Sequence, residues 1–334
     1  MTADDRADWR PAASVATLQL RARLISRLRA FLDRYGVLEV ETPLLSRSAT
    51  TDVHLRSLTT RYTGPGAPEG RTLYLHTSPE FPMKRLLAAG SGSIYELCKV
   101  FRDGESGRLH NPEFSLLEWY QVGDDHHILM EHLAALVADA LDGLASLAPP
   151  QKITYRDAFR HYAGIDPFTD EATVFTDWAQ HHGIRPPADL GQAPEDLDGW
   201  RDLILTHAVE PRLGRGRLTF MYDYPASQAA LARVRPGSPP IAERFELYAE
   251  GMELANGYHE LADAAELARR FDSDLKRRRG LGGVEVPDDK LLLAALAHGL
   301  PECSGVALGV DRLVMLAAGM DTIDKVLAFP VGRA

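Results

Sequence analysis

The chain has 334 residues, 45% of them hydrophobic and 25% charged, which is typical of a globular protein with a sizeable core. Its net charge of −10 argues against a broad nucleic-acid-binding surface. No apolar run approaches the ~20 residues that span a bilayer, and the acidic residues 1–12 lack the hydrophobic stretch of a signal peptide. We therefore expect a cytoplasmic protein without a membrane segment. The two cysteines, Cys98 and Cys303, indicate neither a disulfide framework nor a zinc site.

The first 90 residues predict a helix, two strands and a second helix. Residues 14–35 carry apolar side chains at helical spacing and end before Gly36. Residues 37–45 are typical of a strand interrupted at Pro43, a residue that suits a sheet edge or a contact between subunits. A strand over residues 71–77 follows. Ser78 as N-cap and Pro79 as the first helical residue then predict a helix over residues 81–89.

Residues 94–120 predict two strands joined by a long loop. β-Branched and aromatic residues fill both strands, and glycines and a proline break the segment between them. Arg102, Arg108 and His110 crowd the loop, which favours a polyanion nearby because guanidinium groups match phosphate oxygens. Glu118 and Tyr120 share one strand face and offer an acceptor and a hydroxyl suited to an ammonium group. The alternative is an ordinary solvated hairpin tip.

The second half of the chain alternates helices and strands. We expect a helix over residues 125–141 and a largely helical insertion over residues 142–218. Strand character returns over residues 218–225 and 245–261. Two helices follow, over residues 264–278 and 288–298, the second capped by Asp288. Glu246, Glu253 and Glu260 recur every seven residues where burial without a partner would be costly. Two of them beside a triphosphate could hold Mg²⁺. The alternative is an edge strand with its acids in water.

Near the C-terminus, residues 303–319 predict a strand that turns into a helix. Gly305 and Gly309 let the strand pass close to a planar ligand. Arg312 lies in the first helical turn, where a cation is poorly placed for the helix dipole. That position makes sense if Arg312 faces an anion such as the distal phosphate of a nucleotide, although helix packing would also explain the glycines.

Together these stretches resemble the catalytic domain of class II aminoacyl-tRNA synthetases, within them the lysyl branch. YGVLEVETPLL, FRDGESGRLHNPEF and GVALGVDR are similar to the three ordered signatures of that class, and HNPEF and FELYAEGMELANGYHEL are similar to lysine-specific segments. The resemblance implies an α+β fold in which helices flank an antiparallel sheet. It also implies a single catalytic domain over residues 1–334 and a homodimer formed through the Pro43 region.

The chain departs from lysyl-tRNA synthetases in three places. There is no room before Ser14 for an anticodon-binding OB barrel, and Ala307 stands where the third signature typically has glycine. Both features resemble the truncated homologues that attach lysine, preferably (R)-β-lysine, to a lysine side chain of translation elongation factor P. In the second signature Gly104 stands where an acid is usual, so Glu105 is the acid that the resemblance offers for adenine.

The resemblance also implies a role for each site residue. Arg102 would stabilise the α-phosphate of ATP and Arg312 the γ-phosphate, while Glu246 and Glu253 would hold Mg²⁺. The remaining implied ATP contacts are Glu105, His110, Asn111, Leu247 and Gly309. The implied amino-acid contacts are Ser78, Glu80, Tyr120, Glu253, Asn256, Glu260 and Ala307, with Glu80 for the backbone-side amine and Tyr120 and Glu260 for the side-chain ammonium. Two alternatives stay open: a minimal lysyl-tRNA synthetase acting on tRNA, and an inactive paralogue that binds lysine or ATP.

Overall fold

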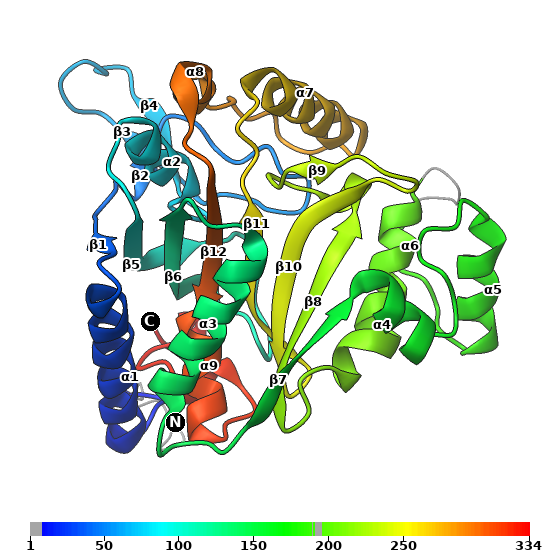
Figure 1. Ribbon diagram of the computed structural model, residues 1–334. Coiled ribbons are helices and arrows are strands. Elements are labelled where there is room, and N and C mark those ends of the chain that lie inside the picture. The colour runs from blue at the N-terminus through cyan, green and yellow to red at the C-terminus, as the bar shows by residue number, and fades with distance from the viewer. Residues whose placement is uncertain (1–8, 189, 191–195) are drawn as a thin grey trace, which may run out of the picture.

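A large twisted sheet organises the chain, shown in Figure 1. The computed structural model describes residues 9–188, 190 and 196–334. Within them the strand order is β1-β5-β6-β12-β11-β10-β8-β7, with β9 beside β10, and all pairs are antiparallel except β1 with β5 and β7 with β8. The strands are β1 (Leu38–Glu39), β5 (Ile94–Phe101), β6 (Glu113–Val122), β7 (Ala148–Thr154), β8 (Arg217–Pro225), β9 (Val234–Arg235), β10 (Ile241–Ala249), β11 (Met252–His259) and β12 (Cys303–Gly309). The predicted α+β class is confirmed.

Helices cover both faces of this sheet (Figure 1). One face packs the main hydrophobic core against α1 (Val15–Arg34), α3 (His126–Leu141) and α9 (Val310–Ala318). The other face packs two smaller cores. One involves α2 (Glu80–Ala88), α7 (Ala264–Gly280) and α8 (Lys290–Gly299), and the other involves α4 (Tyr155–Tyr162), α5 (Ala172–His181) and α6 (Leu197–Ile204). A space between these two cores leaves part of the second face of the sheet open to a ligand.

A small three-stranded sheet adjoins the large one. It has the order β2-β4-β3, with β2 (Leu45–Ser46), β4 (Arg71–Leu75) and β3 (Thr59–Tyr62). The strand predicted over residues 37–45 with a break at Pro43 is interrupted over residues 40–44, so that only the short strands β1 and β2 form. Between them the carboxylate of Glu96 accepts hydrogen bonds from the backbone N and the hydroxyl of Thr42, at 3.0 and 2.8 Å. A side chain thus replaces the strand partner that the backbone of Thr42 would need.

Several other element boundaries differ from the prediction. The N-cap of α2 is Pro79 rather than Ser78, whose hydroxyl accepts from the backbone N of Glu80 at 3.1 Å. The N-cap of α8 is Asp289 rather than Asp288. The stretch 245–261 is a hairpin rather than one strand, because Glu250 and Gly251 both adopt positive φ, as a tight two-residue hairpin turn requires.

The region predicted as a largely helical insertion, residues 142–218, contains α4, α5 and α6 and a short π-helix, Leu205–Val209. It also contains β7, which pairs in parallel with β8 at the edge of the sheet. The prediction missed β7 because its sequence, APPQKIT, has two prolines and little alternation. Residues 189 and 191–195 of this region, and residues 1–8 of the acidic N-terminal stretch, lie outside the described residues.

A buried ion pair joins three elements behind the open face. Asp311, in the first turn of α9, is 1% exposed and accepts hydrogen bonds from the guanidinium of Arg21 in α1 and from the backbone N of Ser115 in β6. Arg21 also donates to the hydroxyl of Ser115 at 2.7 Å. Because Arg312 follows directly in the chain, this pair fixes where Arg312 enters the open face.

Candidate active site

A cavity of about 580 Å³ occupies the open face of the sheet. Its floor is built from alternate residues of four neighbouring strands, since side chains two apart share one face of a strand. Two cross-strand rows follow from the register. The first row joins Glu246, Asn256, Ala307 and Glu118, and the second joins Arg244, Tyr258, Gly305 and Tyr120. Every site residue that the resemblance implies, except Leu247, lines this cavity. Arg108, the third cation expected to face a polyanion, does not line it and donates instead to the backbone oxygen of Asp321 at 3.1 Å.

Glu118 provides a carboxyl group at one end of the first row. Its side chain is buried, the hydroxyl of Tyr120 donates to Oε1 at 2.6 Å, and the hydroxyl of Ser78 donates to Oε2 at 2.5 Å. Burial, followed by the nearby charge of Glu80, raises the pKa of Glu118 to about 8. A ligand ammonium placed here would favour the ionised carboxylate, so the group is suited to recognise an amine.

A buried lysine lies next to this carboxyl group. The Nζ atom of Lys84, 2% exposed, lies 2.6 Å from both Glu80 Oε1 and Glu260 Oε2. Burial lowers the pKa of Lys84, but the charges of Glu260 and Glu80 outweigh it and raise the pKa above its ordinary value. Lys84 is therefore charged and offsets two of the three carboxyl groups at this end of the cavity. Tyr120, predicted to act together with Glu260, instead hydrogen-bonds Glu118.

Glycine is required at one point of the floor. A Cβ atom at position 305 would lie 2.4 Å from the ring of Tyr120 and 2.5 Å from Glu260 Oε1. Any side chain there would displace the two groups. The sequence predicted that Gly305 lets the strand pass close to a planar ligand; the groups that lie against it here are protein side chains, and the approach of a ligand stays a prediction. At Gly309 a Cβ atom would meet nothing closer than the backbone oxygen of Leu254 at 3.6 Å, so that position has room for a methyl group.

Asn256 and Ala307 face each other across β11 and β12. Asn256 donates from Nδ2 to the hydroxyl of Tyr258 at 3.1 Å, while its buried Oδ1 has no hydrogen-bond partner among the described residues. A free buried acceptor beside the cavity is costly unless a ligand donor satisfies it. Ala307 lies between Asn256 and Glu118 in the first row, so its methyl group forms part of the cavity floor.

The other end of the cavity gathers groups from three segments. Arg312 of α9 donates from Nη1 to the backbone oxygen of Glu253 at 2.8 Å and from Nη2 to Nε2 of His110 in the hairpin loop at 2.8 Å. Burial, and then the charge of Arg312, lowers the pKa of His110, so its imidazole is a neutral acceptor. These contacts hold the guanidinium of Arg312 with the hairpin loop on one side and β11 on the other.

Arg102 lies at the start of the same loop. Its guanidinium stacks 4.9 Å from the ring centroid of Phe114 and lies 3.7 Å from the carboxylate of Glu105. Asn111 lines the cavity too, but its amide donates to the backbone oxygen of Glu113 at 2.6 Å and accepts from the backbone N of Val331 at 2.9 Å. Asn111 therefore ties the loop to the C-terminal segment as well as facing the cavity.

The two acids predicted to hold a metal differ in their surroundings. Glu246 is buried, and its carboxylate accepts from the guanidinium of Arg244 and the hydroxyl of Tyr248. The side chain of Glu253 is 38% exposed and lies 3.5 Å from Arg312. Because Glu253 lies within the cavity, desolvation by the surrounding protein, followed by the charge of Glu246, raises its pKa although the side chain keeps this exposure. Two oxygen donors that repel each other fit a hard divalent cation such as Mg²⁺, with Glu253 the more available ligand.

Leu247 is the predicted site residue that the structure places elsewhere. Its side chain is fully buried in the main hydrophobic core, on the opposite face of the sheet from Glu246. The alternation of side chains along β10 makes this unavoidable once Glu246 faces the cavity. Only the backbone of Leu247 could contact a nucleotide.

Two cations of the site were not predicted from the sequence: the buried Lys84 and the partly buried Arg244. Lys84 lies four residues after Glu80 in a helix, a spacing that places two side chains in contact and could have been noticed. Arg244 is two residues before Glu246 on the same strand face, and its guanidinium also stacks 4.5 Å from the ring centroid of Tyr224. The contacts of Lys84 with Glu260 and of Arg244 with Tyr224 could not be predicted from the sequence, because the partners lie on different elements.

Comparisons with known proteins found a matching family and several similar proteins. Residues 4–333 match the family described as tRNA synthetases class II (D, K and N). A Vibrio cholerae protein named elongation factor P–(R)-β-lysine ligase is 48% identical over 98% of this chain and 99% of its own length. Proteins of the same name from Vibrio vulnificus (46% identical, 97% and 98% covered) and Yersinia enterocolitica (47% identical, 99% of both) are also similar. Among the described residues no helix is both long and apolar enough to cross a membrane.

The raised pKa of Glu118 predicts a pH dependence of stability. The folded chain keeps this carboxyl protonated up to about pH 8, whereas an unfolded chain releases the proton near the usual value of 4.5. The folded state thus binds more protons in that window, and the free energy of unfolding falls as pH rises from 5 to 8. Denaturant titrations should show that Glu118→Gln reduces this fall by more than ~1 kcal/mol.

Glu113→Gln is the matched control, because Glu113 lies on the same strand with a side chain 53% exposed. Its pH profile of stability should follow that of the unmodified protein. A Glu118→Gln profile that is equally steep would show that Glu118 ionises normally in the folded chain.

Proposed function

We propose, from the finding that the chain belongs to the class II tRNA synthetase family (D, K and N), that it activates lysine or (R)-β-lysine with ATP and transfers it to a lysine side chain of elongation factor P. The observation that carries the substrate class is Glu118, a buried carboxyl group held by Ser78 and Tyr120 at one end of the cavity. A substrate with a second amino group could neutralise it. The names of the relatives support the acceptor.

The first step we propose joins the substrate to AMP. The carboxylate oxygen of the amino acid attacks the α-phosphorus of ATP, a P–O bond forms, and pyrophosphate leaves with its bonding electrons. Arg102 would stabilise the charge on the α-phosphate and Arg312 that on the γ-phosphate, because fixed cations act strongly on charge that develops in a water-poor site. Mg²⁺ held by Glu253 and Glu246 would supply further neutralisation of the phosphates.

In the second step the amine of the acceptor lysine, after losing a proton, attacks the carbonyl carbon of the adenylate. An amide bond forms and AMP leaves. The chain contributes by holding the adenylate in place, since positioning alone lowers the barrier to a bimolecular reaction. We propose Glu105, His110, Asn111 and Gly309 as nucleotide contacts, and Glu80, Asn256, Glu260 and Ala307 as surroundings of the amino acid. Glu80 would meet the backbone-side amine.

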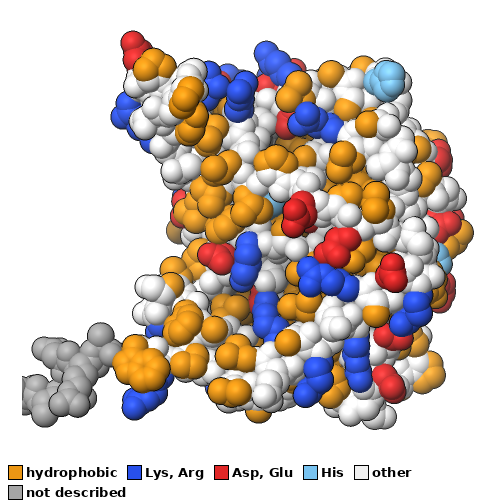
Figure 2. Space-filling model, turned by 90° about the vertical axis from the view of Figure 1, so that its left-hand side faces the viewer, with side chains coloured by type: hydrophobic (Ala, Val, Ile, Leu, Met, Phe, Trp, Pro, Cys, Tyr) orange, Lys and Arg blue, Asp and Glu red, His pale blue; other side chains and the backbone are white. Residues whose placement is uncertain are grey.

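We also propose that the protein works as a homodimer in the cytoplasm. Large apolar side chains are exposed on one side of the molecule, at the end of α1, in β1 and around β2 and β3, and Figure 2 shows orange side chains gathered on that side. They are Tyr35 (49%), Leu38 (56%), Leu44 (40%), Leu45 (46%) and Tyr62 (42%). Pro43 is exposed among them. An exposed apolar patch of this kind is typical of a subunit interface.

The acceptor is tested by following labelled substrate. Lysine and (R)-β-lysine, each labelled, are incubated with enzyme and ATP and then offered in parallel to purified elongation factor P and to total tRNA. We expect label on the protein factor. Label on tRNA alone would make the protein a minimal lysyl-tRNA synthetase, as its family description suggests, and would overturn the proposed acceptor. Label on neither would favour a lysine- or ATP-binding paralogue without catalytic activity.

Activation itself is tested through Arg102. Arg102→Ala should lower ATP–pyrophosphate exchange by about 10²-fold or more, because the variant loses a charge donor to the α-phosphate. The matched control is Arg269→Ala, whose side chain in α7 is 68% exposed and pairs with Glu266 of the same helix, away from the cavity. Near-normal exchange by Arg102→Ala would remove Arg102 from the proposed mechanism.

A further inference from the structure

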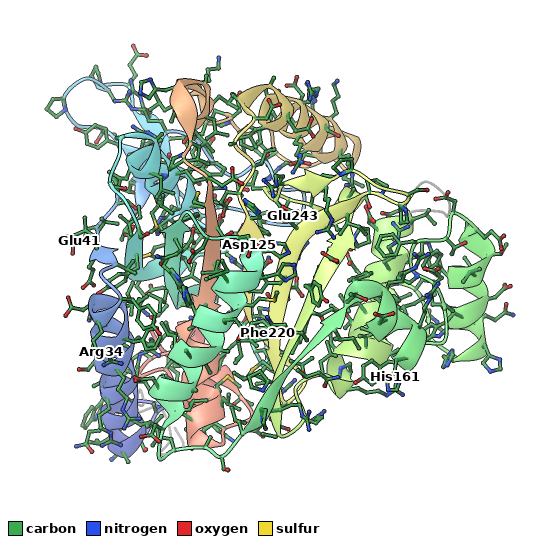
Figure 3. All side chains as sticks on the ribbon, viewed as in Figure 1. Arg34, Glu41, Asp125, His161, Phe220 and Glu243 are labelled. Atoms are coloured by element: carbon green, nitrogen blue, oxygen red, sulfur yellow. The ribbon has the colours of Figure 1, made fainter. Side chains whose placement is uncertain are left out.

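A second cluster of ligand-type side chains lies on the face of the sheet opposite the cavity. His126 is the first residue of α3, and Glu243 and His259 lie on the neighbouring strands β10 and β11. All three are buried, with 2%, 5% and 4% exposure. Each offers one ligand atom, and these atoms all lie within 4.8 Å of one another. Figure 3 labels Glu243 on the sheet and Asp125, the N-cap of α3.

His126 has no role within the described part of the protein that explains its burial. Among the described residues neither of its ring nitrogens has a hydrogen-bond partner. An imidazole nitrogen with an unused lone pair is a common metal ligand, and an unpaired buried polar group calls for an explanation.

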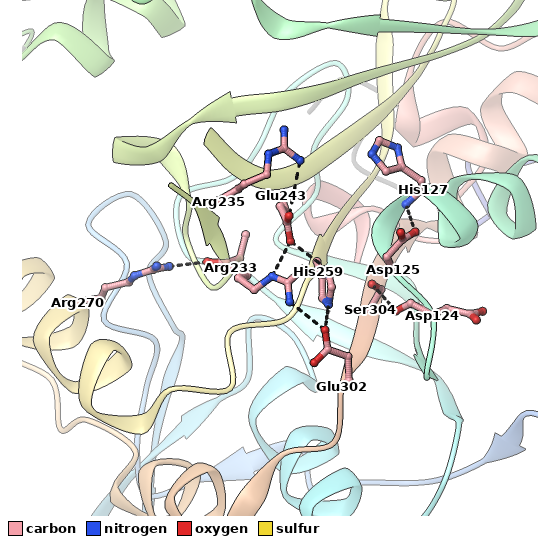
Figure 4. Close-up of polar contacts among 11 residues, drawn as sticks. Asp124, Asp125, His127, Arg233, Arg235, Glu243, His259, Arg270, Glu302 and Ser304 are labelled. Carbon is pink, nitrogen blue, oxygen red and sulfur yellow. Dashed lines mark hydrogen bonds and ion pairs between the residues drawn. The ribbon is translucent and has the colours of Figure 1, made fainter. Parts of the chain in front are cut away.

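The other two residues are already oriented as metal ligands usually are. Nε2 of His259 lies 3.0 Å from Glu302 Oε1, which leaves Nδ1 directed at Glu243 Oε2, also at 3.0 Å. Figure 4 shows His259 between the two carboxylates, with Arg233 contacting both of them. In metal sites an outer carboxylate commonly fixes the ring of a ligating histidine in this way.

We propose that His126, Glu243 and His259 form a binding site for one zinc ion. Two imidazoles and one carboxylate are a donor set that Zn²⁺ accepts, with water as the fourth ligand. Zinc bonds of ~2.0–2.2 Å bring ligand atoms to roughly 3–3.5 Å of one another, so small side-chain rotations close the site. The ion would join α3 to β10 and β11.

Two guanidinium groups beside Glu243 do not prevent this. Arg233 lies 2.7 Å from Glu243 but also 2.9 Å from Glu302, and its side chain is 44% exposed. Arg235 lies 3.6 Å from Glu243 and 3.1 Å from Asp223. Each arginine therefore keeps a second carboxylate partner when Glu243 binds a cation. Zn²⁺ would also satisfy a nitrogen of His126, which neither arginine can do.

The test is zinc retention by the full chain. The protein is stripped with a chelator, equilibrated with Zn²⁺, dialysed and analysed for metal, and Co²⁺ is added to a second sample to report tetrahedral coordination by its d–d absorption. We expect about one tightly held Zn²⁺ per chain and a tetrahedral Co²⁺ spectrum. His126→Leu should weaken zinc binding more than ~10-fold and abolish the spectrum, since a ligand is lost.

His132→Gln is the matched control, because His132 lies on the same helix but pairs with Asp124 at 3.5 Å outside the cluster. It should retain zinc. Glu243→Gln provides a second variant of almost unchanged shape and should lose zinc as His126→Leu does. No retention by the unmodified protein, or equal retention by His126→Leu and Glu243→Gln, would overturn the proposal. Pyrophosphate exchange is not the readout, so failure here is distinct from failure of the proposed function.

Discussion

The cavity depends on one buried cation, Lys84. Its ammonium lies 2.6 Å from the carboxylates of Glu80 and Glu260, and without it two acids would face each other in a space that water scarcely reaches. Breaking such a buried pair is far more costly than losing an exposed one, because the partner charge is left uncompensated. With Lys84 bound to those two acids, Glu118 has no cation in direct contact among the described residues, and it is therefore the carboxyl group available to a ligand amine.

The sheet makes this division of charge possible. Alternate residues of β6, β12, β11 and β10 meet in cross-strand rows, so Glu118, Ala307, Asn256 and Glu246 lie in one line across the cavity floor. The positions of these four floor residues relative to one another are thus fixed by strand register, whereas Arg102 and His110 at the other end of the cavity come from the loop between β5 and β6. Gly305 belongs to the neighbouring row and has no room for a side chain, because a Cβ atom there would collide with Tyr120 and Glu260.

Sequence patterns over a few neighbouring residues predicted those parts of the site that lie within a single element or loop. The loop between β5 and β6, Arg312 at the start of α9, and the shared face of Glu118 and Tyr120 follow from turn residues and strand alternation. The partner of Glu260 could not be predicted, because Lys84 comes from a helix far away in the sequence. Leu247 was misplaced since adjacency to Glu246 in sequence means opposite faces in a strand. β7 was not predicted because its own sequence has weak strand character, and it forms a strand through parallel pairing with β8.

The most direct test of this account is whether Glu118 selects for a substrate amine. Pyrophosphate exchange would be measured with lysine and with norleucine, a similar chain without the side-chain ammonium, for the unmodified protein and Glu118→Gln. We expect the unmodified protein to prefer lysine strongly, because norleucine would leave the buried carboxyl group of Glu118 without a partner. Glu118→Gln should lose about 10²-fold or more of that preference. A preference for lysine unchanged in Glu118→Gln would contradict the central role given to this carboxyl group.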